Sequence, residues 1–162
     1  MTANTMKKRL LIGISFAVGI LAIGAISVGT MFYWQNADAV PLVTVYKSPT
    51  CGCCKNWVKH MEDNGFEVTS VDLQDVSSIK HQFGITNNLV SCHTAIVDGY
   101  AVEGHVPAQD VKRLLSEKPD VIGISVPGMP AGSPGMEMGN RYDRYSVITF
   151  DKNGNVEVFS QY

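Results

Sequence analysis

Charged residues are scarce in this sequence, and neither sign dominates. They make up 17% of the 162 residues, with 13 Lys and Arg against 15 Asp and Glu, while 45% of the residues are hydrophobic. Disordered chains combine high net charge with few apolar residues, so this composition excludes a disordered protein. The length provides for one ordinary domain and an appendage, which argues against a multidomain enzyme.

Acidic residues outnumber basic ones after residue 39. Residues 40–162 contain 10 Lys and Arg against 14 Asp and Glu, a net charge of −4. Domains that bind nucleic acids carry clustered basic side chains, and this region has no basic stripe. We therefore expect no nucleic-acid partner.

One stretch near the start has no charge at all. Of the 25 residues 10–34, 18 are apolar, and the basic residues 7–9 precede them. A helix of that length spans about 37 Å, enough to cross a hydrocarbon core of about 30 Å, and the basic flank places the following chain outside the cytoplasm. The length favours a retained anchor, whereas Ala-Asp-Ala at 37–39 fits a cleaved signal. We predict a signal anchor or signal peptide at 1–39 and an exported domain at 40–162.

Strand and helix patterns alternate within the exported domain. Alternating β-branched residues and helical spacing of apolar residues predict strands at 40–46, 66–73, 94–97, 100–103, 146–150 and 156–159, and helices between 51 and 65, at 75–83 and at 107–117. Strand, helix and strand within about 35 residues form a unit of βαβ size, whose strands are parallel. Asp-Gly at 98–99 and Asn-Gly at 153–154 predict hairpins. The fold class is therefore α/β, a mixed sheet with flanking helices.

A segment rich in glycine and proline interrupts this pattern. Residues 123–139 contain five Gly and three Pro, too many for a helix or a central strand. Met129, Met136 and Met138 also lie here. Long loops in compact domains are usually functional or disordered, and the composition leaves open an ordered loop or a flexible one.

Three of the four cysteines are clustered. Cys51, Cys53 and Cys54 lie where the first strand meets the first helix, and Cys92 follows later. Free N–H groups and the helix dipole at such a junction favour the thiolate over the thiol. We expect these sulfurs to be reactive or bound to metal, with Ser48 or Thr50 capping the helix.

Two other uses of the cysteines have to be weighed. Structural disulfides within so tight a cluster would close very short loops and constrain the unfolded chain little. Cys51 and Cys54 form a C-x-x-C pair, as in thiol-disulfide oxidoreductases. Cys53 lies between them and could attack any mixed disulfide, which suits metal binding better than clean exchange.

The other residues near the cysteines in sequence suggest which metal binds. Cysteine, methionine and histidine together form a soft ligand set that suits Cu(I), whereas Zn²⁺ would need only Cys and His. His93 adjoins Cys92, but neighbouring side chains in a strand face opposite sides, so we rank His105 above His93 as a ligand. His60 and His81 are expected to be surface residues.

Four motifs in order resemble a known family. They are Cys-Gly-Cys-Cys-Lys-Asn-Trp at 51–57, Ser-Cys-His-Thr-Ala at 91–95, Val-Glu-Gly-His-Val-Pro-Ala at 102–108 and the Met-containing stretch at 126–137. Together they resemble the CopG-like periplasmic copper-resistance proteins of Gram-negative bacteria. The resemblance covers roughly residues 43–150 and implies a thioredoxin-like fold, export to the periplasm and a polynuclear copper site bridged by cysteine sulfurs.

The resemblance also implies a ligand set and a function. The metal ligands it implies are Cys51, Cys53, Cys54, Cys92 and His105, with Met129 and Met136 in a covering loop. The function would be sequestration of Cu(I) for copper resistance; if copper also cycled between Cu(I) and Cu(II), the protein would be a copper oxidoreductase. Its partners would be copper ions, periplasmic copper-handling proteins and, if residues 10–34 are retained, the inner membrane. The alternative is a thiol-disulfide oxidoreductase, although thioredoxin-like proteins usually have a cis-proline where this chain has Cys92.

Overall fold

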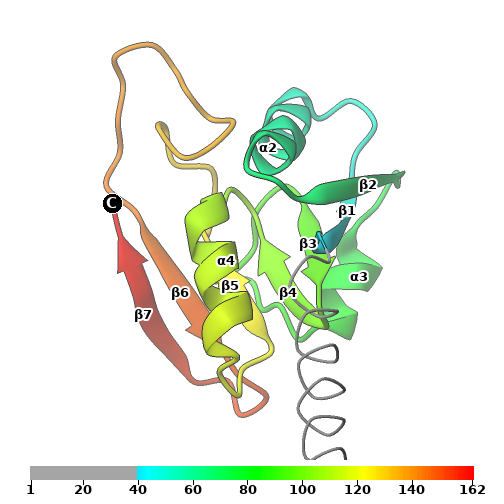
Figure 1. The fold of residues 1–162 in the computed structure, drawn as a ribbon, viewed down its shortest axis with the longest axis vertical. Helices are drawn as coiled ribbons and strands as arrows, with labels where there is room; N and C mark the ends of the chain where they lie inside the picture. The colour runs from blue at the N-terminus through cyan, green and yellow to red at the C-terminus, as the bar shows by residue number, and fades with distance from the viewer. Residues whose placement is uncertain (1–39) are drawn as a thin grey trace, which may run out of the picture. The chain divides into compact units, whose positions relative to one another are not determined.

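The protein, seen in a computed structural model, is described over residues 40–162. Its elements in chain order are β1 (Leu42–Lys47), α2 (Gly52–Asp63), β2 (Glu67–Asp72), α3 (Ser77–Gln82), β3 (Thr94–Val97), β4 (Tyr100–Glu103), α4 (Ala108–Glu117), β5 (Gly123–Ser125), β6 (Ser146–Phe150) and β7 (Val156–Gln161) (Figure 1). The predicted signal or anchor at 1–39 lies outside the described residues. None of the helices in residues 40–162 has both the length and the hydrophobicity of a membrane span.

All seven strands of this region belong to one mixed sheet, in the order β2-β1-β3-β4-β5-β6-β7. β1 runs parallel to β2, as a βαβ unit through α2 requires, and antiparallel to β3. β4 is antiparallel to β3 and parallel to β5, and β6 and β7 complete the sheet as an antiparallel hairpin. The predicted α/β class is confirmed, and the predicted elements occur in the predicted order, with β5 as an unpredicted strand after α4. Asp98 and Gly99, both with positive φ (47° and 84°), form the predicted turn between β3 and β4.

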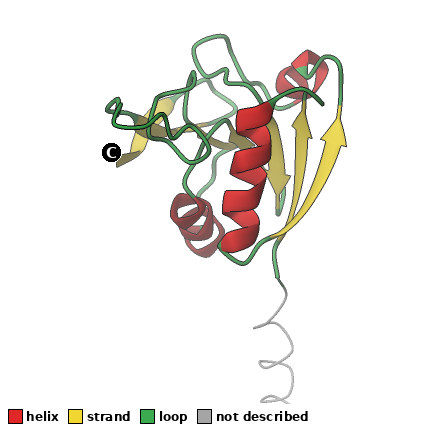
Figure 2. Ribbon diagram, turned by 90° about the horizontal axis from the view of Figure 1, so that it is seen from above, coloured by secondary structure: helices red, strands yellow, loops and turns green. Residues whose placement is uncertain are grey.

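Side chains of alternate strand positions build a separate core on each face of the sheet. Trp57 and Met61 of α2 and Leu114 of α4 pack against one face. Phe150 and the segment after α3, including Leu89, fill the other. Figure 2 shows helices on both sides of the strands. The fully buried Trp57 and Met61 fix α2 to the sheet, so the start of α2 has a defined position.

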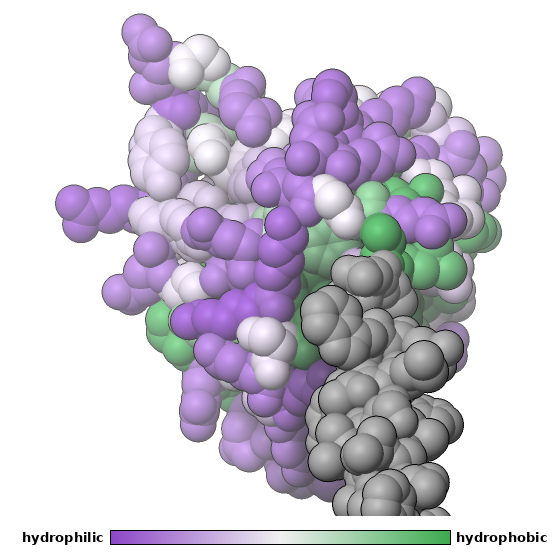
Figure 3. Space-filling model, viewed as in Figure 1, coloured by the Kyte–Doolittle hydropathy of each residue, from purple (hydrophilic) through white to green (hydrophobic). Residues whose placement is uncertain are grey.

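The outward face of α2 is polar, as its sequence predicts. Lys55, Lys59 and Asp63 are exposed, and Lys59 pairs with Asp63 one turn later. The surface in Figure 3 is accordingly mostly hydrophilic over α2 and α4. Gly65, with φ of 87°, ends the helix at the expected place, because a left-handed residue stops the helical ladder.

The Gly- and Pro-rich segment begins inside the sheet, which corrects the prediction for 123–139. Gly123 opens β5, between β4 and β6, where a Cβ would overlap the backbone carbonyl of Ala101. A glycine is therefore required for β5 to approach β4 closely. Residues 126–145, here called the cover loop, connect β5 to β6 and are ordered by their own hydrogen bonds, such as Gly132 N–H to the Met136 carbonyl at 2.9 Å.

Candidate metal centre

Three sulfurs gather at the amino end of α2. Cys51 is itself the N-cap, and its sulfur accepts from the Cys54 amide at 3.3 Å. The expected caps, Ser48 and Thr50, lie too early because the helix begins only at Gly52. Cys51 and Cys54 form a disulfide, and the Cys53 sulfur lies 3.4 Å from that of Cys51.

The fourth sulfur comes from the segment just before β3. β3 pairs directly with β1, so the residues entering β3 pass close to the residues leaving β1. Cys92 Sγ lies 3.4 Å from Cys54 Sγ, and all four cysteine sulfurs lie within 4.8 Å of one another. Cys53 and Cys92 are free thiols. The structure thus brings together all four predicted sulfur ligands.

Two histidines adjoin Cys92. Its sulfur lies 3.0 Å from His105 Nε2 and 3.3 Å from His93 Nδ1, and these three ligand atoms also lie within 4.8 Å of one another. Cys92 and His93 thus face the same centre, because β3 starts only at Thr94 and the alternation of a strand does not apply to them. The order of His105 above His93 as a ligand stays a prediction. The signal for His93 was the Cys-His dipeptide itself.

Hydrogen bonding fixes the tautomer of His105. Its Nδ1 lies 2.8 Å from the Pro134 carbonyl, which can only accept, so Nδ1 carries the proton. In the neutral ring Nε2 then carries no proton, and its lone pair, which could bind a metal, faces the Cys92 sulfur. Metal-binding histidines are commonly oriented in this way by a carbonyl on the other nitrogen.

Burial keeps the groups around Cys92 uncharged when no metal is bound. Burial and, to a smaller extent, the neighbouring Cys53 raise the pKa of the Cys92 thiol to about 12. Burial lowers the pKa of His105, against the opposing effects of the Pro134 carbonyl and Glu137. Burial also lowers the pKa of His93 well below its usual value. The centre therefore offers neutral imidazoles and a thiol whose proton a metal has to displace.

The cover loop lies against this centre. Gly135 has a φ of 80°, and a Cβ there would stand 2.7 Å from Trp57 N and 2.8 Å from the Cys53 carbonyl. Met136 follows and is half-buried, whereas Met129 and Met138 are more than half exposed, at 53% and 55%. Met129 and Met136 stay predictions as ligands.

The two remaining histidines differ from each other. His81 is exposed on α3, as expected. His60 is half-buried rather than a free surface residue, because its Nε2 accepts from the Ala108 amide at 3.1 Å and so joins α2 to the first turn of α4. The sequence did indicate this partial burial, because His60 lies between the polar and apolar faces of α2.

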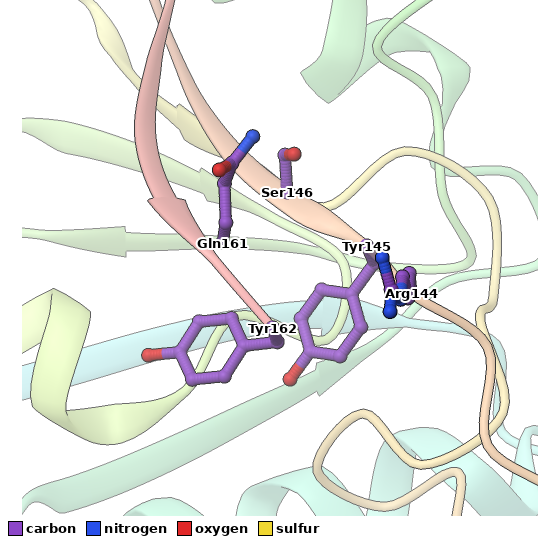
Figure 4. A pocket seen from close by; sticks show the side chains of 5 residues that line it. All are labelled: Arg144, Tyr145, Ser146, Gln161 and Tyr162. Carbon is purple, nitrogen blue, oxygen red and sulfur yellow. The ribbon is translucent and has the colours of Figure 1, made fainter.

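A cavity of about 370 Å³ lies elsewhere, where β6 begins and β7 ends. Its lining residues are Arg144, Tyr145, Ser146, Gln161 and Tyr162 (Figure 4). The two tyrosine rings stack at 5.0 Å, and Tyr162 donates to the Asp110 carboxylate at 2.7 Å. The lining offers neither thiol nor imidazole, so this cavity is not the metal centre.

The donor set at the cysteines fits copper well. Thiolate and neutral imidazole are soft to intermediate ligands, and clustered thiolates select Cu(I) and Zn²⁺ over Mg²⁺ or Ca²⁺. In the disulfide form only Cys53 and Cys92 can become thiolates. Reduction of one disulfide therefore doubles the number of thiolate ligands.

Comparison with known proteins identifies the family. The family described as "Protein of unknown function, DUF411" matches residues 89–136, and no curated protein matches the chain. The solved structure "Copper resistance protein copG- Form 2" is 46% identical, covering 76% of this chain and 98% of that one, with a TM-score of 0.73. Its Form 1 is 47% identical over 75% and 96%, with a TM-score of 0.71. The chain belongs to the CopG family of copper resistance proteins.

Proposed function

We propose that this protein sequesters Cu(I) in a cysteine-bridged, polynuclear site and so contributes to copper resistance. The observation that carries the proposal is the meeting of four cysteine sulfurs within 4.8 Å, beside two neutral histidines. Cys51, Cys53, Cys54 and Cys92 supply bridging thiolates, and His105 supplies a nitrogen through Nε2. Cycling between Cu(I) and Cu(II) at this site is part of the proposal, because a site of mixed sulfur and nitrogen donors accommodates both states.

The proposal extends to the fold and the location. The order of β1 to β4 with α2, α3 and α4 fits a thioredoxin-like core, to which β5, β6 and β7 add an extension. We place this domain, residues 40–162, in the periplasm, with residues 1–39 as its signal or anchor. What supports the location is the basic flank and apolar run of the sequence.

Copper counting on reduced protein tests the ligand set. Anaerobically reduced protein is loaded with Cu(I), and copper, zinc and free thiols are counted per chain. Cys92→Ser should lower the copper number, and His105→Gln should weaken Cu(I) binding, whereas the exposed His81→Gln serves as the matched control and should bind like wild type. If Cys92→Ser bound as much copper per chain as wild type, the four-sulfur site would be refuted.

A second function is favoured by one observation, the disulfide between Cys51 and Cys54. Such a pair at a strand–helix junction is the arrangement used for thiol-disulfide exchange. In that case the protein would reduce or form disulfides in a model substrate without copper, and Cys54→Ser would abolish the activity. Absence of exchange in copper-free wild type would leave copper binding as the function of the cluster.

A further inference from the structure

A buried carboxylate lies beside the metal centre, on β4. Glu103 is fully buried, and its partner Lys80, from α3, is 8% exposed. Lys80 Nζ lies 2.5 Å from Glu103 Oε1. Replacing such a pair with well-packed apolar residues is often neutral or stabilising, so an ion pair here is weak support for a purely stabilising role.

The carboxylate also holds the chain that carries Cys92. Glu103 Oε1 accepts from the backbone amide of Ser91 at 2.6 Å, and Oε2 accepts from the Thr94 hydroxyl at 2.6 Å. Lys80 lies 3.1 Å from the same hydroxyl. The two anchored residues, Ser91 and Thr94, flank Cys92 and His93 on either side.

The backbone next to Glu103 holds the same segment. Gly104 has a φ of 74°, its amide donates to the His93 carbonyl at 3.0 Å, and a Cβ at Gly104 would overlap the Ser91 side chain. His105 follows directly. Residues 103–105 therefore supply the candidate ligand His105 and also hold the segment that carries Cys92 and His93.

We propose that Glu103 is a positioning residue of the metal centre: through Ser91 and Thr94 it holds Cys92 and His93 towards the sulfurs of α2. The proposal rests on the proposed copper function. Because residues 91–93 lie before β3 begins, the hydrogen bonds from Glu103 add to the backbone bond between Gly104 and His93 in holding this segment. Mutation of residues that orient metal ligands typically lowers metal affinity by roughly 10- to 100-fold.

Two double variants separate positioning from stability. Lys80→Met/Glu103→Leu removes both charges together and retains an apolar core, but gives the Ser91 amide and the Thr94 hydroxyl no acceptor. Lys80→Met/Glu103→Gln restores an amide oxygen for the Ser91 amide. We expect Cu(I) affinity, measured by competition with a chelator, to fall by roughly 10- to 100-fold in the first and to recover in the second. Lys59→Gln/Asp63→Asn, at an exposed ion pair, is the matched control and should bind like wild type.

Measurements of thermal stability and of Cys92 alkylation distinguish loss of positioning from loss of folding. Thermal unfolding shows whether each variant folds; if the leucine variant does not, Thr94→Val takes its place, with a several-fold loss expected. Wild-type affinity in a folded leucine or valine variant would overturn the positioning role. If wild type binds no Cu(I), the copper function fails, and positioning is judged by alkylation of Cys92 in metal-free protein, which should be faster in the leucine variant than in the glutamine variant. Equal alkylation rates would overturn it.

Discussion

A single methyl group added at Gly135 should open the metal centre. This residue has a φ of 80°, which an L-residue adopts at a cost of about 1–2 kcal/mol. Its new Cβ would also meet two backbone atoms of α2, at 2.7 and 2.8 Å. Helix α2 is anchored by fully buried Trp57 and Met61, so the cover loop has to yield instead.

Gly128 provides the control for the conformational cost of a positive φ. It lies in the same loop with a φ of 71°, but a Cβ there meets nothing within 4 Å. Gly128→Ala therefore carries only the conformational cost, while Gly135→Ala adds an overpacking cost of about 1–3 kcal/mol. Since 1.4 kcal/mol corresponds to a factor of ten, the population of the open loop in Gly135→Ala should be roughly 5- to 150-fold higher than in Gly128→Ala.

Two rates measure this opening. In the disulfide form, Cys53 and Cys92 are the free thiols, and mass spectrometry can follow alkylation of each one. In loaded protein, the transfer of Cu(I) to a chelator should accelerate in parallel, because the bond from His105 to the Pro134 carbonyl, next to Gly135, is lost with the displaced loop. Equal rates in Gly135→Ala and Gly128→Ala would refute the reasoning that the loop covers the centre.

Three further outcomes follow from the buried groups. Since burial raises the Cys92 pKa to about 12, Cu(I) has to displace a proton at neutral pH; affinity should therefore fall as pH decreases, by about tenfold per unit for this ligand, and Cys92→Ser should have a shallower pH dependence in a chelator titration. Lys80→Met alone leaves Glu103 buried without its cation and should cost about 3–5 kcal/mol in urea unfolding, so a loss below 1 kcal/mol would contradict the pairing. Trp57→Phe loses the 2.8 Å bond from Nε1 to the Val106 carbonyl and should cost about 1–3 kcal/mol in the same assay, whereas an unchanged midpoint would show that bond to be dispensable.

Local signals were sufficient for most of the fold. The Asp98-Gly99 turn fixed both strands of its hairpin to the residue, because a turn with two positive φ values leaves little freedom in register. Helix α2 was recognised from Trp57 and Met61 at helical spacing, with Gly65 at its end. Patterns of this kind act over a few residues and can be read without knowing the partner surface.

Tertiary context decided the remaining features. Gly123 reads as a loop residue, and only the proximity of β4 makes it a strand residue. Lys80 lies in a polar helix and gives no sign of being buried, because its partner Glu103 is 23 residues away. The direction of the His93 side chain could not be inferred from local sequence, because residues 91–93 lie before β3 and are held by the contacts of Ser91 and Thr94 with Glu103.

The cover loop connects two strands that are neighbours in the sheet. β5 and β6 pair antiparallel, so residues 126–145 are in effect an enlarged turn of a hairpin, with both ends fixed by the register of Gly123 to Phe150. None of the four cysteines belongs to this hairpin. Changes in this turn away from Pro134, Gly135 and Met136 should therefore alter how fast a metal ion or a chelator reaches the centre, while the four cysteines keep their places. Access to the centre can then vary in sequence independently of the cysteine cluster.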